Sequence, residues 1–260
     1  MRALEKSEPE RALQRAEHFR GQSGYAINYR DLPIFAAPGL HELAAERLAT
    51  VLAPAGARVL ELGAGAGAMS LRLKDRGYAV TASDLNERSF VPTREIPFVA
   101  LDLNEAFAQR LQRRFDAIVA LELVEHLENP CHFFRQCREA LENKGFLLVS
   151  TPNLANPVSQ AMFATRGHFQ WFNDNDYHEQ GHIMPLSPGV LRRCWTEAGF
   201  VCRWQGSVGD PLRMLDRKRD RRLRWISKLL AAVSATPDAL RGEVYLAVLQ
   251  VGGLDGDDSP

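Results

Sequence analysis

Residues 58–67 read RVLELGAGAG, an apolar run that leads into three alternating glycines. Residues 59–62 have the length and composition of a buried strand. Glycines adopt positive φ and allow close backbone approach, and the apolar spacing from Met69 to Leu73 indicates a helix directly afterwards. A helix start offers unpaired N–H groups to polar ligand atoms. The stretch therefore predicts a nucleotide-type site, although a plain βα turn would carry the same glycines.

The composition is that of an ordinary globular enzyme. The chain has 260 residues, of which 45% are hydrophobic and 25% are charged. This length fits one domain with insertions, so we expect a single domain over residues 1–260. The formal net charge is zero, which argues against nucleic acid as a general partner and leaves a local basic patch open.

The cysteines and the chain ends indicate a cytoplasmic protein. Because Cys131, Cys137, Cys194 and Cys202 form no CxxC pair, we expect free thiols in a reducing compartment rather than zinc or disulfide sites. The first residues are charged and lack the apolar stretch of a signal peptide, so we expect no signal peptide and no membrane span. We interpret residues 1–38 as an N-terminal arm and residues 252–260 as a disordered tail.

Strand patterns alternate with helical patterns along most of the chain. The expected strands after the first lie at residues 78–83, 97–101, 115–121 and 145–150, and a helix is expected at 129–141. This rhythm predicts an α/β fold with a doubly wound parallel sheet. Ligands of such sheets bind at the carboxyl ends of the strands.

A carboxylate follows the second expected strand. Asp84 lies 21 positions after Gly63, where such a fold holds the ribose diol of a nucleotide. A turn or helix-capping aspartate is the alternative interpretation.

Residues 154–184 lose this periodicity. The segment is rich in aromatic residues and contains His168, His178 and His182. We interpret residues 154–186 as a lid or acceptor segment above the strand ends. A small aromatic core is the alternative, and the two interpretations are compatible.

Two late strands, expected at residues 200–205 and 243–251, enclose a basic helical insertion at 206–241. Eight Arg and Lys residues fall between positions 213 and 228, next to an apolar helical stripe that continues to 233. One interpretation is a solvated amphipathic helix that covers the core. The other is that residues 213–233 contact a polyanionic substrate or an anionic membrane, with the protein peripheral at the inner membrane face.

Several stretches together resemble the class I S-adenosylmethionine (SAM)-dependent methyltransferases. They are ELGAGAG (61–67), Asp84, LDLNE (101–105), FDAIVALELVEHLENP (115–130), GFLLVSTPN (145–153) and GHIMPLSPGVLRRCWTEAGF (181–200). The nearest resemblance is to the group that includes ubiquinone-biosynthesis-type O-methyltransferases. It implies a Rossmann-like, seven-stranded, mostly parallel sheet that ends in an antiparallel hairpin, which the two late strands fit.

The resemblance also implies residue roles in the cofactor site. Glu61 would order the amino end of SAM, the glycines would approach its methionine part, and Asp84 would hold its ribose. Asp102 and Leu103 would frame the adenine, and Leu121 and Glu122 would lie beside the sulfonium. The implied SAM-binding set is Glu61, Gly63, Gly65, Gly67, Asp84, Leu85, Asp102, Leu103, Leu121 and Glu122.

The catalytic hypothesis concerns Glu122, Glu125, His126 and the lid residue His182. These four could chelate a divalent cation such as Mg²⁺, or His126 could act as a general base. A similar ExxEH motif with a later histidine forms a metal site in small-RNA 2′-O-methyltransferases. Helix-start and packing roles for Glu125 and His126 are the alternative.

The predicted function is SAM-dependent methyl transfer to a hydroxyl group of a small molecule, a sugar or a lipid-linked precursor. Three alternatives stay open at this point. They are metal-assisted 2′-O-methylation of RNA, SAM binding without catalysis, and an NAD-linked oxidoreductase, since Gly63, Gly65 and Ala68 also fit a dinucleotide fingerprint.

Overall fold

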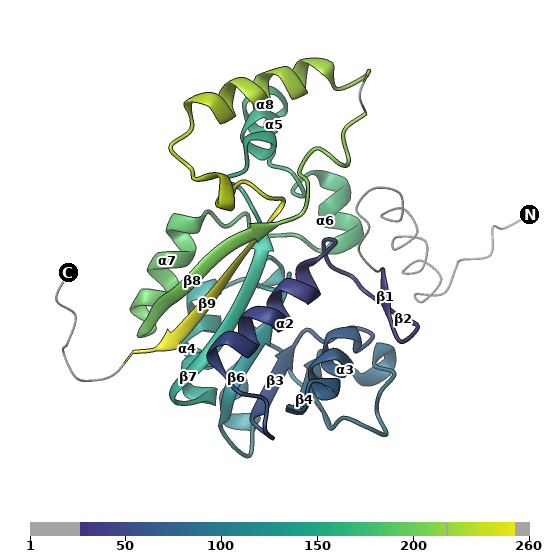
Figure 1. Ribbon diagram of the computed structural model, residues 1–260, viewed down its shortest axis with the longest axis vertical. Helices are drawn as coiled ribbons and strands as arrows, with labels where there is room; N and C mark the ends of the chain where they lie inside the picture. Colours follow the sequence, from purple (N-terminus) through teal and green to yellow (C-terminus); the bar gives the residue numbers. More distant parts are fainter. Residues whose placement is uncertain (1–26, 217, 253–260) are drawn as a thin grey trace, which may run out of the picture.

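The computed structural model describes residues 27–216 and 218–252. Seven strands form one sheet in the order β5-β4-β3-β6-β7-β9-β8 (Figure 1). The strands are β3 (Arg58–Leu62), β4 (Ala79–Asp84), β5 (Phe98–Ala100), β6 (Phe115–Ala120), β7 (Leu141–Pro152), β8 (Phe200–Val208) and β9 (Val244–Val251). The first five run parallel, and β9 lies antiparallel between β7 and β8. The expected sheet and its antiparallel end are confirmed.

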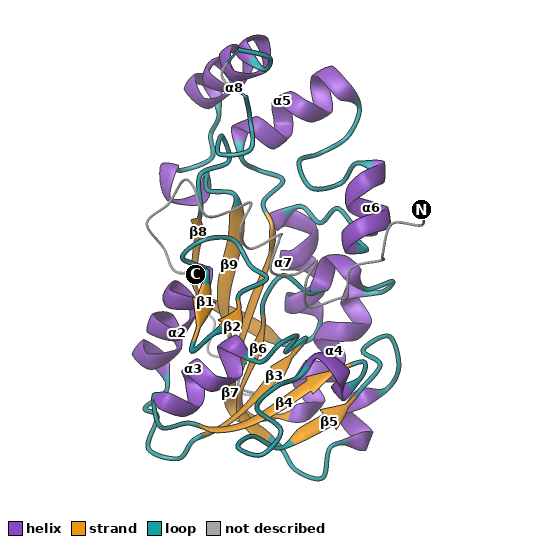
Figure 2. Cartoon of the chain, turned by 90° about the vertical axis from the view of Figure 1, so that its right-hand side faces the viewer, coloured by secondary structure: helices purple, strands orange, loops and turns teal. Residues whose placement is uncertain are grey.

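Helices cover both faces of the sheet (Figure 2). The helices of the sheet layers are α2 (Leu40–Val51), α3 (Ala68–Asp75), α4 (Pro130–Ala140) and α7 (Pro188–Glu197). Successive strand residues alternate between the two faces, so that Leu60 and Ile118 pack with α4 and α7, whereas Val59 and Val119 pack with α2 and α3. This double burial explains why the strands are apolar without interruption.

The expected lid contains helices that the loss of periodicity concealed. They are α5 (Pro157–Arg166) and α6 (Asp174–Gln180). Each begins at an asparagine cap, Asn156 or Asn173, whose side chain accepts a backbone hydrogen bond from the first turn. The late insertion contains α8 (Arg221–Val233), which packs against α5. The helical insertion is therefore present, and its main partner is the lid.

The N-terminal arm is ordered where the structure describes it. Its strands β1 (Asn28–Tyr29) and β2 (Leu32–Pro33) form a small antiparallel pair, and the Tyr29 hydroxyl donates to Asp75 at 2.7 Å. The expectations for residues 1–26 and for the tail at 253–260 lie outside the described residues.

The expectation of four free thiols is wrong for one pair. Cys131 of α4 and Cys194 of α7 form a disulfide with a Cα–Cα distance of 4.6 Å, because these two helices pack side by side. Cys137 and Cys202 are free.

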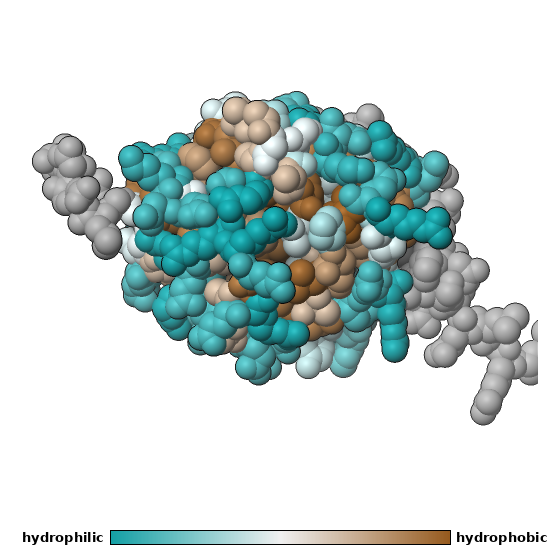
Figure 3. Space-filling view, turned by 90° about the horizontal axis from the view of Figure 1, so that it is seen from below, coloured by the Kyte–Doolittle hydropathy of each residue, from teal (hydrophilic) through white to brown (hydrophobic). Residues whose placement is uncertain are grey.

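The surface at the end where the parallel strands begin is mainly hydrophilic, with apolar groups gathered near its centre (Figure 3). In the part of the chain that the structure describes, no helix is both long enough and apolar enough to cross a bilayer.

Candidate active site

The glycine turn joins the end of β3 to the start of α3. Gly63, Gly65 and Gly67 have φ values of 72°, 52° and 91°, which residues with a Cβ rarely adopt. The Gly65 N–H donates to Asp84 Oδ2 at 2.9 Å. The two predicted binding elements, the turn and the β4 carboxylate, are therefore joined directly.

The space around the turn differs from one glycine to the next. A Cβ on Gly67 would lie 2.6 Å from Pro92 and 2.8 Å from Phe90, so packing within the chain requires this glycine. A Cβ on Gly65 would lie 3.4 Å from the ring of Phe35, whose side chain is 47% exposed. Gly65 is thus the turn residue that lies beside an accessible aromatic side chain.

Glu61 lies beneath the turn and is 5% exposed. Its carboxyl oxygen accepts a hydrogen bond from the Ser70 hydroxyl. Burial, with a smaller contribution from the nearby Asp84 carboxylate, raises the pKa of Glu61 to about 8. A cationic ligand would favour the ionised form of this carboxyl.

The residues assigned to the ribose and adenine lie at the ends of β4 and β5. Asp84 Oδ1 accepts from the Leu85 N–H at 2.7 Å, and the apolar Leu85 side chain is 66% exposed. Leu103 is buried, and the exposed Asp102 accepts from the Asn104 N–H at 3.0 Å. Leu85 therefore offers an apolar surface beside Asp84.

Glu122 follows β6 with a φ of 48°. Its N–H donates to Ser150 Oγ at 2.8 Å, and its carboxylate accepts from the Ala37 N–H at 2.8 Å. Burial raises the pKa of Glu122 to about 7. Leu121, beside it, is partly buried against the core. The N-terminal segment that carries Phe35 and Ala37 therefore borders the site, although its sequence contains no binding motif.

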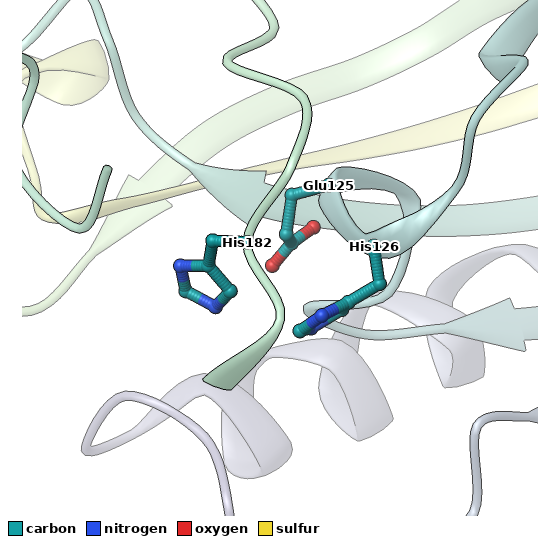
Figure 4. A group of neighbouring side chains, drawn as sticks. All are labelled: Glu125, His126 and His182. Atoms are coloured by element: carbon teal, nitrogen blue, oxygen red, sulfur yellow. The ribbon is translucent and has the colours of Figure 1, made fainter. Parts of the chain in front are cut away.

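Glu125, His126 and His182 form a compact group at the end of β6. One ligand atom from each lies within 4.8 Å of the others, and the two rings are 4.8 Å apart. Figure 4 shows the Glu125 carboxylate between the imidazoles. Glu125 and His126 belong to the 3₁₀ turn Val124–His126, whereas His182 follows α6. Glu122, proposed as a fourth ligand from the sequence, is outside this group.

Both imidazoles are oriented by backbone carbonyl groups. His126 Nδ1 lies 3.1 Å from the Gly181 oxygen, and His182 Nδ1 lies 2.7 Å from the Trp171 oxygen. Because a carbonyl oxygen only accepts, the neutral tautomer protonated on Nδ1 satisfies both contacts and leaves a lone pair on Nε2. Burial lowers the pKa of both histidines, and the neighbouring His182 also lowers that of His126. Both rings are therefore prepared to accept a proton or to bind a metal ion.

Glu125 is fully buried. Its neighbours are the Thr151 hydroxyl and its own backbone N–H, both of which lower its pKa. Burial raises the pKa of Glu125 well above its ordinary value, and the Glu122 carboxylate raises it further. A buried carboxyl group is costly to ionise, and a bound cation would favour its ionised form.

A buried ion pair lies behind His182. Arg213 Nη2 donates to Glu243 Oε1 at 2.7 Å, and these side chains are only 7% and 1% exposed. The Arg213 guanidinium lies 5.6 Å from the centre of the Trp171 ring. Trp171 itself has a φ of 69°, so this cluster surrounds the strained residue whose carbonyl orients His182.

The segment that follows α6 attaches the lid to the site. The N–H groups of Ile183 and Met184 donate to the Glu125 carbonyl at 3.0 and 2.9 Å. This attachment explains why His182 reaches the group, while His178 lies exposed on α6. His168 forms no hydrogen bond with the catalytic candidates. Its Nδ1 lies 3.0 Å from the Phe169 carbonyl oxygen.

A cleft of about 460 Å³ opens between the end of α5 and the start of α6. It is lined by Arg166, Gly167, His168, Phe172, Asn173, Asp174 and Asn175. The Phe172 ring is 5.6 Å from that of His182. One wall residue of this cleft therefore contacts the histidine group.

Residues 35–204 match the methyltransferase domain family. The Ubiquinone biosynthesis O-methyltransferase of Pseudomonas aeruginosa (strain LESB58) is 32% identical over 120 residues, which cover 44% of this chain and 51% of that protein. The enzyme of the same name from Cereibacter sphaeroides (strain KD131 / KCTC 12085) is 33% identical over 113 residues, with 41% and 45% covered. The chain spans about half the length of the curated relatives it matches.

A SAM-dependent methyltransferase from Archaeoglobus fulgidus has the same fold, with a TM-score of 0.54 at 18% identity over 81% of this chain and 94% of that one. The family match covers more than half of the sequence, and the sheet ends in the expected antiparallel pair. The chain therefore belongs to the class I SAM-dependent methyltransferases.

Proposed function

We propose that this protein transfers the methyl group of SAM to a hydroxyl group of a small-molecule, sugar or lipid-linked acceptor. The observation that carries the proposal is the paired orientation of His126 and His182. Each ring donates Nδ1–H to a backbone carbonyl and keeps an unprotonated Nε2. A hydroxyl acceptor needs such a group, because its oxygen is a weak nucleophile until its proton is removed.

His126 is the proposed general base. It lies six residues after the end of β6, in the segment that also carries Leu121 and Glu122, the residues assigned to the sulfonium. The acceptor oxygen forms a bond to the methyl carbon as the carbon–sulfur bond breaks. The bonding electron pair goes to sulfur, and the hydroxyl proton goes to His126 Nε2. Alignment of oxygen, carbon and sulfur supplies much of the acceleration.

The histidine group also fits a divalent cation. Glu125 supplies a buried carboxyl group close to both rings, and His126 and His182 supply imidazole nitrogens held by carbonyl groups, a common arrangement around metal sites. Two imidazoles and one carboxylate suit Zn²⁺, Mn²⁺ or Fe²⁺ better than Mg²⁺. A cation bound there would lower the pKa of a coordinated hydroxyl.

The names of the relatives support a hydroxyl acceptor. Both curated relatives are O-methyltransferases of ubiquinone biosynthesis. The cleft beside Phe172 and His182 is where we place entry of the acceptor. Its polar lining favours an acceptor that carries several hydrogen-bonding groups near the reacting hydroxyl.

Formation of S-adenosylhomocysteine by the purified chain tests the proposal. The acceptors would be ortho-dihydroxy phenols with and without an isoprenoid tail, simple sugars, and an RNA with a free 3′ end. Each would be measured with a chelator and with added Mg²⁺, Mn²⁺ or Zn²⁺. We expect turnover with a hydroxylated small molecule.

The same assay separates the alternatives. Turnover only with RNA would favour 2′-O-methylation, to which the exposed cations of α8 could contribute. SAM binding without turnover on any acceptor would favour a non-catalytic SAM-binding subunit. Calorimetric titration with SAM and NAD is expected to detect SAM alone, since the chain belongs to a SAM-dependent family.

A further inference from the structure

Helices α5 and α8 form a cap at one end of the molecule, beyond the sheet (Figures 1 and 2). The cap has an apolar core of its own, separate from the two cores of the sheet. Its buried members are Val158, Ala161, Met162 and Leu223, with Leu212, Leu215, Ile226 and Leu230 packed around them. The inner side of α8 is therefore fully used in packing against α5.

The outer side of α8 is also apolar. Trp225, Leu229 and Val233 are 64%, 51% and 75% exposed. Their spacing of four residues places them in one stripe along the helix. Leu223 and Ser227, which point to the opposite side, are buried. A helix that only covered the core would carry polar side chains in this stripe.

Cationic side chains surround the stripe. Arg221, Arg222 and Lys228 are exposed on α8, and Lys218 and Arg219 are exposed immediately before it. None of the five forms an ion pair with another residue in the described ranges. Of the two acidic residues in the same run, Asp220 forms an ion pair with Arg166, and the exposed Asp216 accepts from the N–H groups of Lys218 and Arg219. The local charge is thus strongly positive although the net charge of the chain is zero.

We propose that the outer face of α8 binds the surface of an anionic lipid bilayer. Tryptophan and aliphatic side chains would enter the interface between headgroups and acyl chains, and the cations would contact lipid phosphates. The stripe lies on one convex helix at the end of the molecule, a shape that suits a flat surface better than a folded partner. An RNA would use the cations but would have no need of Leu229 or Val233.

Membrane binding at this helix has a consequence for the lid. The cap begins with α5, directly after the carboxyl end of β7, and α5 leads into the cleft at Arg166. A bilayer that contacts α8 would therefore lie on the side of the molecule where the parallel strands end. The proposal concerns binding alone, so it stands or fails independently of the identity of the acceptor.

Sedimentation with lipid vesicles tests the proposal on the full chain. Vesicles of phosphatidylcholine alone are compared with vesicles of equal parts phosphatidylcholine and phosphatidylglycerol, at low and high salt. We expect binding to the anionic vesicles only, with affinity that falls as salt increases. Arg221→Glu/Arg222→Glu and Trp225→Ser/Leu229→Ser should each lower the affinity by at least about tenfold.

Two variants on α7 serve as matched controls. Arg192→Glu/Arg193→Glu makes the same change of charge at another exposed arginine pair, and Val190→Ser removes an apolar side chain that is 40% exposed. Both should bind anionic vesicles like the unmodified protein. Trp225→Phe, which keeps an aromatic side chain, should retain most of the affinity.

Three results would overturn the proposal. The first is no sedimentation with anionic vesicles. The second is an equal loss in the α7 charge variant, which would indicate general electrostatic attraction. The third is unchanged binding in Trp225→Ser/Leu229→Ser. Binding of a short RNA that depends on Arg221 and Arg222, without any vesicle binding, would assign the surface to nucleic acid instead.

Discussion

His182 Nδ1 lies 2.7 Å from the backbone carbonyl oxygen of Trp171. Trp171 holds this carbonyl in place with a positive φ of 69°, a conformation that costs energy in a residue with a bulky side chain. The guanidinium of Arg213, 5.6 Å from the Trp171 ring centre, and its partner Glu243 supply the packing that sustains it. The carbonyl that orients His182 is therefore supported by an ion pair between the late insertion and Glu243, the residue immediately before β9.

Arg213→Met should lower both stability and turnover. The Glu243 carboxylate would stay buried without its partner, which costs about 3–5 kcal/mol. The double variant Arg213→Met/Glu243→Leu should recover most of the free energy of unfolding but little of kcat, since Trp171 would still lack its cation. Urea unfolding and methyl-transfer assays measure the two effects.

The exposed pair Lys74–Glu95, whose side chains are 38% and 52% exposed, provides the control. Lys74→Met should cost less than about 1 kcal/mol and leave kcat unchanged. Full recovery of kcat in the double variant would show that Arg213 acts only on stability.

His126→Asn and His182→Asn should reduce turnover while SAM still binds. Loss of a positioned acid–base group lowers rates by about 10²–10⁴-fold, whereas neither imidazole is assigned to SAM. Calorimetry with SAM and initial rates with saturating acceptor measure the two quantities. His178→Asn, on the exposed side of α6, should behave like the unmodified protein. Equal activity in all three variants would remove the histidine group from the mechanism.

Gly65→Val should abolish SAM binding without unfolding the protein. The added side chain would meet the Phe35 ring and occupy the space above the turn, where we place the methionine part of SAM. Gly199→Val tests backbone strain alone, because Gly199 has a similarly positive φ of 85° with open space around its Cβ position. The control should bind SAM normally. Asp84→Ala should weaken binding less severely, because it removes only the ribose contact and the bond to the Gly65 N–H.

Local signals account for the parts of the fold that the sequence predicted well. The strand, glycine turn and helix at residues 58–75 are encoded by neighbouring residues. The residues that cap the N-termini of α5 and α6, Asn156 and Asn173, are equally local signals. They were obscured because the aromatic residues around them follow no helical period.

Contacts between distant residues account for most of what the sequence did not predict. Ala37 reaches Glu122 across 85 positions, and Cys131 reaches Cys194 across 63. No sequence motif indicates either contact, because each forms only when distant parts of the chain pack together. The place of Arg213 beside Trp171 was hidden for a further reason: it lies in a basic run whose other described members are exposed, apart from the half-buried Arg224.

Reduction of the Cys131–Cys194 disulfide should destabilise the protein. A crosslink that closes a loop of 63 residues restricts the unfolded chain by about 4 kcal/mol in the loop-entropy description. Cys131→Ser should lower the free energy of urea unfolding by a similar amount, and a reducing agent should then have no further effect. Equal stability of the protein with and without reductant would contradict the disulfide.

The stability of the ligand-free protein should fall as the pH rises from about 6.5 to 8. Glu61 has a pKa of about 8 in the folded protein and an ordinary value of 4.5 when unfolded. Between these values the folded state keeps a proton that the unfolded state has released, so increasing pH favours unfolding by up to about 1.4 kcal/mol per pH unit. The buried histidines His41, His126 and His182 have lowered pKa values, and they produce the opposite slope only below about 6.5.

Glu61→Gln should reduce this slope without removing it, because the amide carries no titrating proton and can still accept from the Ser70 hydroxyl, whereas Glu122 and Glu125, whose pKa values burial also raises, contribute a slope of the same sign. Urea unfolding at several pH values across the window measures the effect. SAM should bind the unmodified protein more tightly as the pH rises, since its positive charge favours the ionised carboxyl group. This pH dependence should be absent in Glu61→Gln. A variant that keeps both the stability slope and the binding slope of the unmodified protein would show that Glu61 is already ionised in the folded state and that its burial is compensated elsewhere.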